Sequence, residues 1–299
     1  MSDILIPTTS DILVPQNDIF FGVFKEQIIK PTILKELGFY QDFWGILYKD
    51  CGLIKYDYKN NMLIYSALLK RLGKTNGKGT IPQLLGNMAE SIIVRKCNEN
   101  PAINQKFFDI SRSIFQTNDD SSNYIAIGTA SHRTKNSTIY KQYYNPNDTQ
   151  RDIIWVSKIN FNNQLILNIQ SDSGFVAGLQ VKTSFDGDKY FGKDLIQNRY
   201  VVPIVYVDLN NDFLSVFMNA LTNGYNGNLS YDLINLKDID FDIYYEMMVF
   251  KEYIYALADN RISIEQFVNA GANTPIGASI VKTIEMAFEP QNLLLTVNN

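Results

Sequence analysis

The sequence predicts an α/β fold, with a central mixed β-sheet flanked by helices. Apolar residues recur at helical spacing before about residue 115 and again after residue 241, whereas short apolar or alternating runs concentrate between them. No GxGxxG or Walker A sequence follows a predicted strand, which argues against a dinucleotide-binding fold and a P-loop NTPase. We therefore expect a helical N-terminal region at residues 1–79, a core at residues 80–220, and a mostly helical region at residues 221–299 packed on that core.

Composition narrows the class of protein further. The chain has 299 residues, of which 45% are hydrophobic and 19% charged, an ordinary globular mixture for one large domain or two modest ones. No apolar run is long enough to span a bilayer, and the N-terminus lacks a basic region followed by an apolar one. Cys51 and Cys97 form neither a disulfide framework nor a CxxC metal motif. These features predict a cytoplasmic protein with reduced thiols and no membrane association.

The net charge of −4 excludes a uniformly basic surface but leaves room for local basic clusters. One cluster, which includes Lys74 and Lys78, surrounds a Gly-rich turn, and the other contains Arg133, Lys135 and Lys141. A solvated loop is the simpler interpretation of either cluster alone. The single histidine, His132, argues against a multi-histidine metal site.

Periodicity and turn residues place the individual elements. The polar segment 129–150 reads as a long loop, and Asn210-Asn211 suggests a hairpin turn. Thr80 and Gln83 form a capping box at the start of a helix. Helices are further expected at 19–29, 32–48, 61–72, 102–115 and from 241 onward, and strands at 124–127, 152–157, 164–169, 178–184, 200–207 and 212–218.

The strand at residues 178–184 carries an unusual pair of polar side chains. The period of two places Leu179 and Val181 on one face, and Gln180 and Lys182 on the other. Because lysine is rarely buried without a partner, a lysine on a central strand indicates a negatively charged ligand. The alternative is an edge strand whose polar face is wet.

Two carboxylates precede this strand in the sequence. Glu90 lies on the predicted helix opposite its apolar face, where it either faces solvent or points into a cleft. Asp152 opens the strand Ile153–Ser157. Asp172 is closer to Gln180 in sequence, but it falls in an apparent turn, so Asp152 is the preferred partner of the Gln-x-Lys strand.

This order of elements resembles the PD-(D/E)xK nuclease superfamily, which has the restriction-endonuclease-like fold. The resemblance covers roughly residues 80–220 and rests mainly on the segments RDIIWVSK and AGLQVKTS. It implies a Mg²⁺-dependent DNA endonuclease, with Mn²⁺ as a possible substitute. The implied enzyme is of the type II restriction or phage-defence kind, and it acts on double-stranded DNA as a homodimer.

The resemblance also implies residue roles. Asp152 would be the principal metal ligand, joined by the Gln180 side-chain oxygen and the Val181 carbonyl, and supported by Glu90. Lys182 would orient or activate the attacking water. DNA contacts would come from Thr183, Ser184, Arg133, Lys135, Lys141, Lys74 and Lys78. Gln180 stands where a carboxylate is commoner, which removes one negative charge and predicts weaker metal binding.

Two alternatives remain open on the sequence alone. The first is a repair or junction-resolving nuclease of the same fold. The second is a non-catalytic DNA-binding or interaction protein, which the missing charge at Gln180 motivates.

Overall fold

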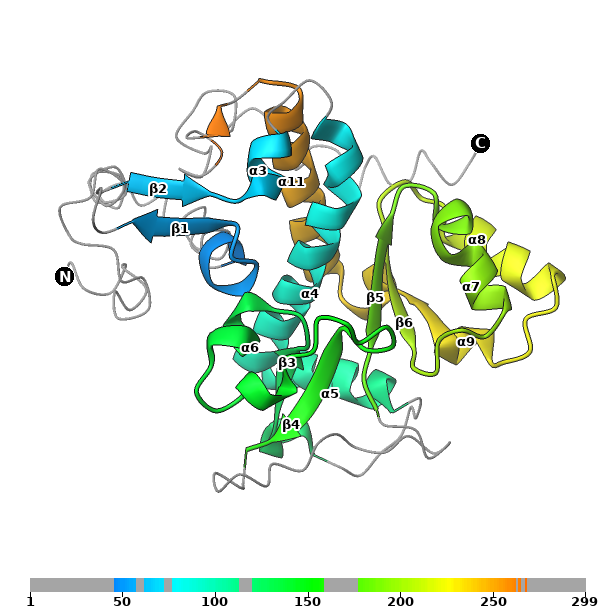
Figure 1. The fold of residues 1–299 in the computed structure, drawn as a ribbon. Helices are drawn as coiled ribbons and strands as arrows, with labels where there is room; N and C mark the ends of the chain where they lie inside the picture. The colour runs from blue at the N-terminus through cyan, green and yellow to red at the C-terminus, as the bar shows by residue number, and fades with distance from the viewer. Residues whose placement is uncertain are drawn as a thin grey trace. The chain divides into compact units, whose positions relative to one another are not determined.

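The computed structural model describes residues 46–57, 62–72, 77–112, 120–158 and 177–261, together with residues 263, 264 and 267. Two compact units are formed, one by residues 82–250 and the other by residues 1–81 and 251–299. Helices and short sheets are both present, which confirms the α/β class (Figure 1). Within the described ranges, no helix combines the length and apolar character needed to cross a bilayer.

The unit of residues 1–81 and 251–299 contains a small antiparallel hairpin. Strand β1 (Ile54–Asp57) pairs with β2 (Met62–Tyr65), with Ile54 opposite Tyr65. The predicted helix at 61–72 is therefore wrong in its first half, because pairing with β1 outweighs helix propensity there. Its second half is correct as α3. Among its described residues, this unit includes the helical elements η1 (Ile46–Asp50), α3 (Ala67–Leu72) and η2 (Gly77–Thr80).

Two long helices form the helical layer of the 82–250 unit. Helix α4 (Ile81–Glu99) begins directly after Thr80 and is buried along much of its length, including Leu84, Met88 and Ile92. Helix α11 (Phe241–Ala258) lies beside it, and Lys96 of α4 pairs with Glu246 of α11 at 3.1 Å. Helix α5 (Pro101–Ser111) follows α4, with Asn100 as its N-cap.

A pair of antiparallel strands lies next to α5. Strand β3 (Tyr124–Gly128) pairs with β4 (Ile153–Ser157), and Trp155 is buried between the strands and α5. The indole N–H of Trp155 donates to Asn104 Oδ1 at 2.8 Å, which satisfies a polar group that would be costly to bury alone. Both strands were predicted from the sequence and are confirmed to within one residue.

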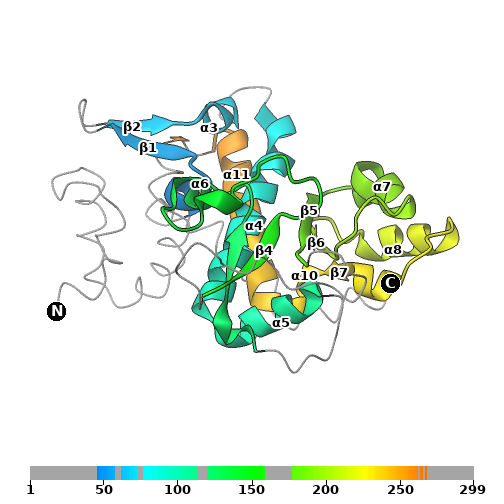
Figure 2. The same cartoon turned by 60° about the horizontal axis from the view of Figure 1, so that its bottom comes forward.

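The second sheet of this unit is parallel. Strands β5 (Gln180–Ser184), β6 (Ile204–Asp208) and β7 (Leu233–Asn235) pair in the order β5-β6-β7. Every residue of β6 is buried, as expected for a strand covered on both faces. An antiparallel bridge between Ile153 and Leu179 joins β4 to the start of β5 (Figure 2). The described strands of this unit thus form one antiparallel pair and one parallel sheet joined by a single bridge, rather than the one central mixed sheet that the sequence predicted.

The helical elements that connect β5 to β6 and that follow β6 were not predicted as such. The predicted strand at 212–218 is wrong, because α8 (Phe213–Thr222) occupies that segment. The side chain of Asp208 accepts hydrogen bonds from the N–H groups of Asp212 and Phe213 and so starts a helix at the point where a hairpin was expected. The connection from β5 to β6 contains η5 (Asp188–Gly192) and α7 (Lys193–Ile196).

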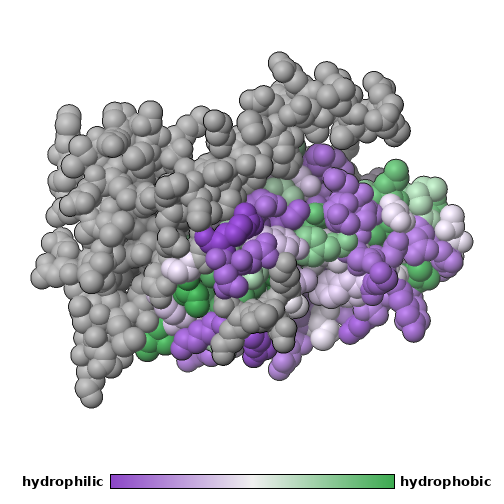
Figure 3. Space-filling view, turned by 90° about the horizontal axis from the view of Figure 1, so that it is seen from above, coloured by the Kyte–Doolittle hydropathy of each residue, from purple (hydrophilic) through white to green (hydrophobic). Residues whose placement is uncertain are grey.

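The exposed face of α8 is apolar. Leu214, Met218 and Leu221 are 69%, 47% and 56% exposed, respectively. Hydrophobic surface is visible on the side of the molecule that carries α7 and α8 (Figure 3). The opposite face buries Val216 and Ala220, which are four residues apart, as on one face of a helix. The segment reads as a strand in the sequence because it is largely apolar, so neither period stands out in it.

The predicted loop at 129–150 is partly helical. It contains α6 (His132–Asn136) and η4 (Lys141–Tyr143). Ser131 caps α6 by accepting from Thr134 N–H, and the Thr134 hydroxyl donates to the Gly128 carbonyl at 2.7 Å. These bonds tie the segment to the end of β3.

The 82–250 unit extends beyond the predicted core boundary at residue 220. Its further elements are α9 (Leu229–Asp232), β7 and α10 (Leu236–Ile239), and β7 pairs directly with β6. The structure has η3 (Ser121–Asn123) ahead of β3. The predicted elements at 19–29 and 164–169, most of the one at 32–48, and Asp172 and Lys74 lie outside the described residues.

Candidate active site

The ends of two strands bring Asp152 beside Gln180. Asp152 N–H donates to the Leu179 carbonyl at 2.8 Å, and Leu179 N–H donates to the Ile153 carbonyl at 2.9 Å. Gly178 permits this approach, since a Cβ atom there would stand only 2.9 Å from the Ile153 carbonyl oxygen. The backbone therefore fixes the spacing between the predicted metal aspartate and the Gln-x-Lys strand.

One carboxylate oxygen of Asp152 is fully engaged. Its Oδ2 accepts hydrogen bonds from the Gln180 side-chain amide and, at 2.7 Å, from Val181 N–H. Burial raises the pKa of Asp152 to about 6, although the Val181 hydrogen bond and the charge of Lys182 oppose this shift. Oδ1 accepts no hydrogen bond from a described residue, so it is open to a ligand.

Helix α4 contributes Glu90 to the same region. Its neighbours Ala89 and Ile93 are fully buried, and Glu90 itself is half-buried. Burial raises the pKa of Glu90 well above its ordinary value, the charge of Asp152 raises it further, and Lys182 lowers it. Of the two interpretations left open by the sequence, the structure supports the one in which Glu90 points toward the strands.

Lys182 shares a face of β5 with Gln180, as the period of two predicts. Burial lowers the pKa of Lys182, while the carboxylates of Asp152 and Glu90 raise it. Its ammonium nitrogen lies 5.0 Å from the centre of the Tyr200 ring and 6.0 Å from that of Tyr190. Among the described residues it forms no ion pair, so its charge remains available to an anion.

The amide of Gln180 is incompletely satisfied. Gln180 is 4% exposed, and its Oε1 is buried with no hydrogen-bond partner. Such orphaned buried acceptors are rare and call for an explanation. Val181 N–H points toward Asp152 rather than β6, and in a strand the carbonyl of the same residue faces the same side. The Gln180 amide and the Val181 backbone thus both contact the Asp152 carboxylate.

The metal ligands predicted from the sequence would suit a hard cation with few protein ligands. No group of three or more His, Cys, Asp or Glu side chains that could hold a metal ion is found in the part of the chain that the structure describes. The set proposed from the sequence contains only two acidic residues, Asp152 and Glu90. One or two carboxylates with neutral oxygens are a usual arrangement for Mg²⁺, which keeps several of its waters.

The residues that were predicted to contact DNA differ in their exposure. Thr183 and Ser184 are 4% and 6% exposed, and the Ser184 hydroxyl accepts from Asp186 N–H, so Ser184 is not presented to a phosphate as predicted. The Thr183 hydroxyl is buried without a hydrogen-bond partner among the described residues, as Gln180 Oε1 is, so its predicted contact stays a prediction. Arg133, Lys135 and Lys141 are exposed on the segment 129–150. Lys78 falls in η2, but its side chain lies outside the described part of the structure.

Two aromatic neighbours of the candidate site were not predicted from the sequence. Tyr190 and Tyr200 flank Lys182, although they are 8 and 18 positions away along the chain. Burial raises the pKa of Tyr200 to about 12, with Asp194 adding to the shift. Only the path of the β5–β6 connection brings these rings to the lysine, so no local sequence signal marks them.

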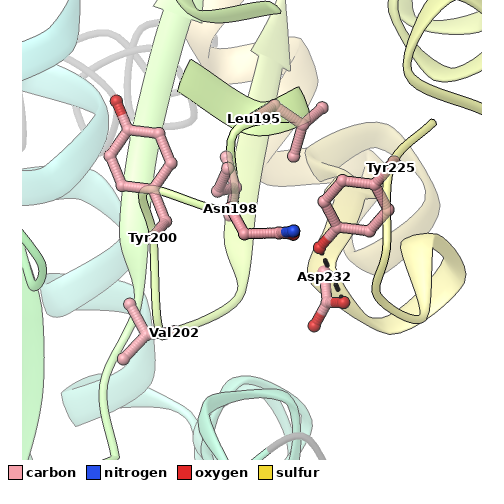
Figure 4. A pocket seen from close by; sticks show the side chains of 7 residues that line it. Leu195, Asn198, Tyr200, Val202, Tyr225 and Asp232 are labelled. Carbon is pink, nitrogen blue, oxygen red and sulfur yellow. Dashed lines mark hydrogen bonds between the residues drawn. The ribbon is translucent and has the colours of Figure 1, made fainter. Parts of the chain in front are cut away.

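A small pocket is lined in part by Tyr200. It has room of ≈ 10 Å³, about the least that one water molecule needs. Within it the Tyr225 hydroxyl donates to Asp232 at 2.8 Å, and the Tyr200 hydroxyl points away from that pair (Figure 4). The remaining lining residues are Leu195, Asn198, Val202 and Ile204. This pocket is too small for a substrate.

Comparisons with known proteins give no family assignment. Neither a family model, nor a curated protein, nor a solved structure matches the chain. We therefore infer the function from the geometry of Glu90, Asp152, Gln180 and Lys182.

Proposed function

We propose that this protein is a Mg²⁺-dependent DNA endonuclease of the PD-(D/E)xK kind, acting in restriction or phage defence. The observation that carries this proposal is the buried, unpartnered Gln180 Oε1 beside Asp152, with Lys182 on the same strand face. Glu90 reaches the same place from α4, since its pKa responds to both Asp152 and Lys182. Four residues from three elements thus converge in the order that the motif requires.

The residues present fit a divalent cation. Asp152 Oδ1, Gln180 Oε1 and the Val181 carbonyl would hold it, and Glu90 would add a second carboxylate nearby. Bound Mg²⁺ would supply a Lewis acid that polarises a phosphate oxygen and lowers the pKa of a bound water. A cation would also relieve the cost of burying two carboxylates next to an unsatisfied amide oxygen.

Lys182 is placed to act on the phosphate. Its ammonium group is partly buried and forms no ion pair among the described residues, so it is free to stabilise charge that develops on the scissile phosphate. Because burial lowers its pKa, it also gives up a proton more readily than a surface lysine, which suits the orientation of an attacking water.

Double-stranded DNA is the proposed substrate. The exposed Arg133, Lys135 and Lys141 offer positive charge for phosphate contacts. Cleavage of both strands requires two active sites, so a homodimer in the cytoplasm is the proposed working form.

Plasmid cleavage tests this proposal. We expect purified protein to cut supercoiled DNA with Mg²⁺ or Mn²⁺ and to stop when EDTA is added. Lys182→Ala should abolish cutting, whereas Lys237→Ala should not, although Lys237 also lies over a tyrosine ring, that of Tyr244, at 5.8 Å. Discrete fragments would indicate a restriction enzyme, and smears a non-specific nuclease. Equal loss in both variants would contradict the role of Lys182.

A non-catalytic DNA-binding protein is the second candidate. The amide at Gln180 favours it, because it replaces a negative charge that would strengthen metal binding. Folded wild-type protein that binds DNA but cuts no plasmid with either metal would support this candidate over the nuclease.

A further inference from the structure

The connection between β5 and β6 presents basic and aromatic side chains next to the candidate site. Tyr190 is 58% exposed, which is unusual for so large a ring. The side chains of Lys189 and Arg199 are 87% and 54% exposed, and Lys193 is also exposed. We call Lys189, Tyr190, Lys193 and Arg199 the basic-aromatic rim.

The Tyr190 ring lies near the candidate site and is anchored to the core. Lys182 Nζ lies 6.0 Å from its centre. Burial raises the pKa of the Tyr190 hydroxyl, and the charges of Asp152 and Glu90 add to this, so both carboxylates are close to the ring. Phe191 meets Tyr190 edge-on at 6.3 Å and is itself packed on Tyr206 at 5.1 Å. The ring is therefore both exposed and anchored.

Two basic side chains of the rim form ion pairs that are exposed to solvent. Lys189 contacts Asp186 at 2.6 Å, and Arg199 contacts Asp194 at 2.7 Å. Exposed ion pairs of this kind are weak, so a phosphate can replace the carboxylate at little cost. Basic side chains that hold a backbone, together with an aromatic ring that receives a base, are the usual means of binding single-stranded nucleic acid.

We propose that Tyr190 stacks against a nucleobase that is not stacked inside a helix, next to the phosphate held at Lys182. This inference rests on the proposed nuclease function and deepens it. A base inside a duplex is covered on both faces by its neighbours, so only an unstacked base can meet the ring. Such a base comes from a single-stranded or branched DNA, or is extruded from a duplex.

Oligonucleotide binding tests the role of the ring without relying on cleavage. Each DNA carries 2-aminopurine, whose fluorescence falls when it stacks, and Ca²⁺ replaces Mg²⁺. The three probes are a full duplex, a duplex with a short single-stranded flap, and a single strand. The full-length wild type is compared with Tyr190→Ala and Tyr190→Phe, and with Tyr231→Ala, which removes another exposed tyrosine on α9.

We expect Tyr190→Ala to weaken binding of flap and single-stranded DNA by about tenfold or more, as loss of one stacked base does elsewhere. The fluorescence quench should disappear in this variant. Tyr190→Phe and Tyr231→Ala should stay within about twofold of the wild type, because the first keeps the ring and the second lies elsewhere.

The pattern across probes identifies the source of the base. If Tyr190→Ala loses affinity only for flap and single-stranded DNA, the substrate is branched or single-stranded. If it loses affinity equally for the duplex, and the wild type quenches 2-aminopurine in that duplex, the base is extruded. The inference is overturned if Tyr190→Ala binds all probes as the wild type does, or if Tyr190→Phe is as weak as Tyr190→Ala. Failure of the wild type to bind any probe would instead remove the nuclease proposal as well.

Discussion

Two acidic clusters lie at opposite ends of the parallel sheet, and they differ in how well their polar atoms are satisfied. One contains Asp152 and Glu90, near Gln180 at the start of β5. The other contains Asp208, at the end of β6, and Asp212. Both place carboxylates in partly or fully buried surroundings, so burial alone does not distinguish them.

The cluster at the end of β6 is closed. Asp208 accepts from the N–H groups of Asn210, Asp212 and Phe213. Asp212 accepts from the Tyr206 hydroxyl at 2.6 Å and from Gly187 N–H at 2.6 Å. Every carboxylate oxygen here has a donor from the protein, and the bonds fix the turn that leads into α8.

The cluster at the start of β5 is open. Gln180 Oε1 has no partner, Glu90 forms no hydrogen bond with a described residue, and Lys182 forms no ion pair among them. Folded proteins rarely leave buried polar groups in this state unless a ligand completes them. The carboxylates at the end of β6 are satisfied by the fold itself, and we propose that a substrate or an ion completes the cluster at the start of β5.

The largest difference should appear in activity. Asp152→Asn should lower metal-dependent DNA cleavage by about 10³-fold or more, because the main charged metal ligand is lost. Asp212→Asn should retain cleavage close to that of the wild type when rates are measured per folded molecule. Similar losses in the two variants would erase the distinction between open and closed clusters.

For stability, unlike activity, the larger effect should come from the cluster at the end of β6. Asp208→Ala leaves three backbone N–H groups without their acceptor, so we expect a loss of about 2–4 kcal/mol in the free energy of unfolding, measured with urea. The exposed Asp238 serves as control, and Asp238→Ala should change stability by less than about 0.5 kcal/mol. Cleavage per folded molecule should survive both changes. A loss at Asp208 no larger than at Asp238 would contradict the structural role.

The pH dependence of stability should reveal the open cluster. Burial raises the folded-state pKa of Asp152 to about 6, above the value of about 3.9 for an unfolded chain. The folded state therefore keeps this proton longer, and its stabilising contribution is present below about pH 4 and lost as the pH rises through about 6.

Asp152→Asn should remove this loss of stability at high pH, because an asparagine side chain does not titrate. Without metal, it should be more stable than the wild type at pH 7 by roughly 2 kcal/mol and similar to it at pH 4. Thermal unfolding in EDTA across this range measures the difference. Asp238→Asn is the control and should not alter the pH profile of stability. If the metal-free wild type instead gains stability relative to Asp152→Asn between pH 4 and pH 6, the predicted direction of the pH dependence is wrong.

The smallest effect is expected at Gln180. Gln180→Glu supplies the commoner carboxylate and should tighten Mg²⁺ binding by about tenfold in calorimetry, while it destabilises the metal-free protein through repulsion from Asp152. Gln197→Glu makes the same charge change at an exposed position and should affect neither quantity. Unchanged affinity in Gln180→Glu would mean that this side chain does not face the ion.

Local patterns predicted where three residues of the candidate site lie, but not their surroundings. Asp152 directly precedes a strand that was predicted from its apolar run, and Gln180 and Lys182 are two residues apart on the next described strand, so their placement follows from order and period. Whether Glu90 points inward depends on how α4 packs, which its own sequence does not encode. Tyr190 and Tyr200 reach Lys182 through a crossover connection, and no spacing rule marks such a meeting.

The errors have physical causes of the same kind. Phe213–Thr222 is apolar enough to read as a strand, but the carboxylate of Asp208, five residues before Phe213, accepts from the N–H groups at the start of the helix. Met62–Tyr65 becomes a strand because β1 offers a pairing partner. In both cases a neighbouring segment outweighed the pattern of the segment itself, whereas α11 and β3 were predicted correctly because each agrees with its own local signal.

The bridge between Ile153 and Leu179 limits how the candidate site can move. Asp152 and Gln180 are tethered by three backbone bonds around Leu179, from Asp152 N–H, Ile153 N–H and Leu179 N–H. The amide protons of these bonds should exchange with deuterated water only on global opening of the 82–250 unit. We therefore infer that any adjustment that admits the proposed nucleic acid substrate comes from segments outside these bonds, such as the β5–β6 connection, while the carboxylate and the amide stay in register.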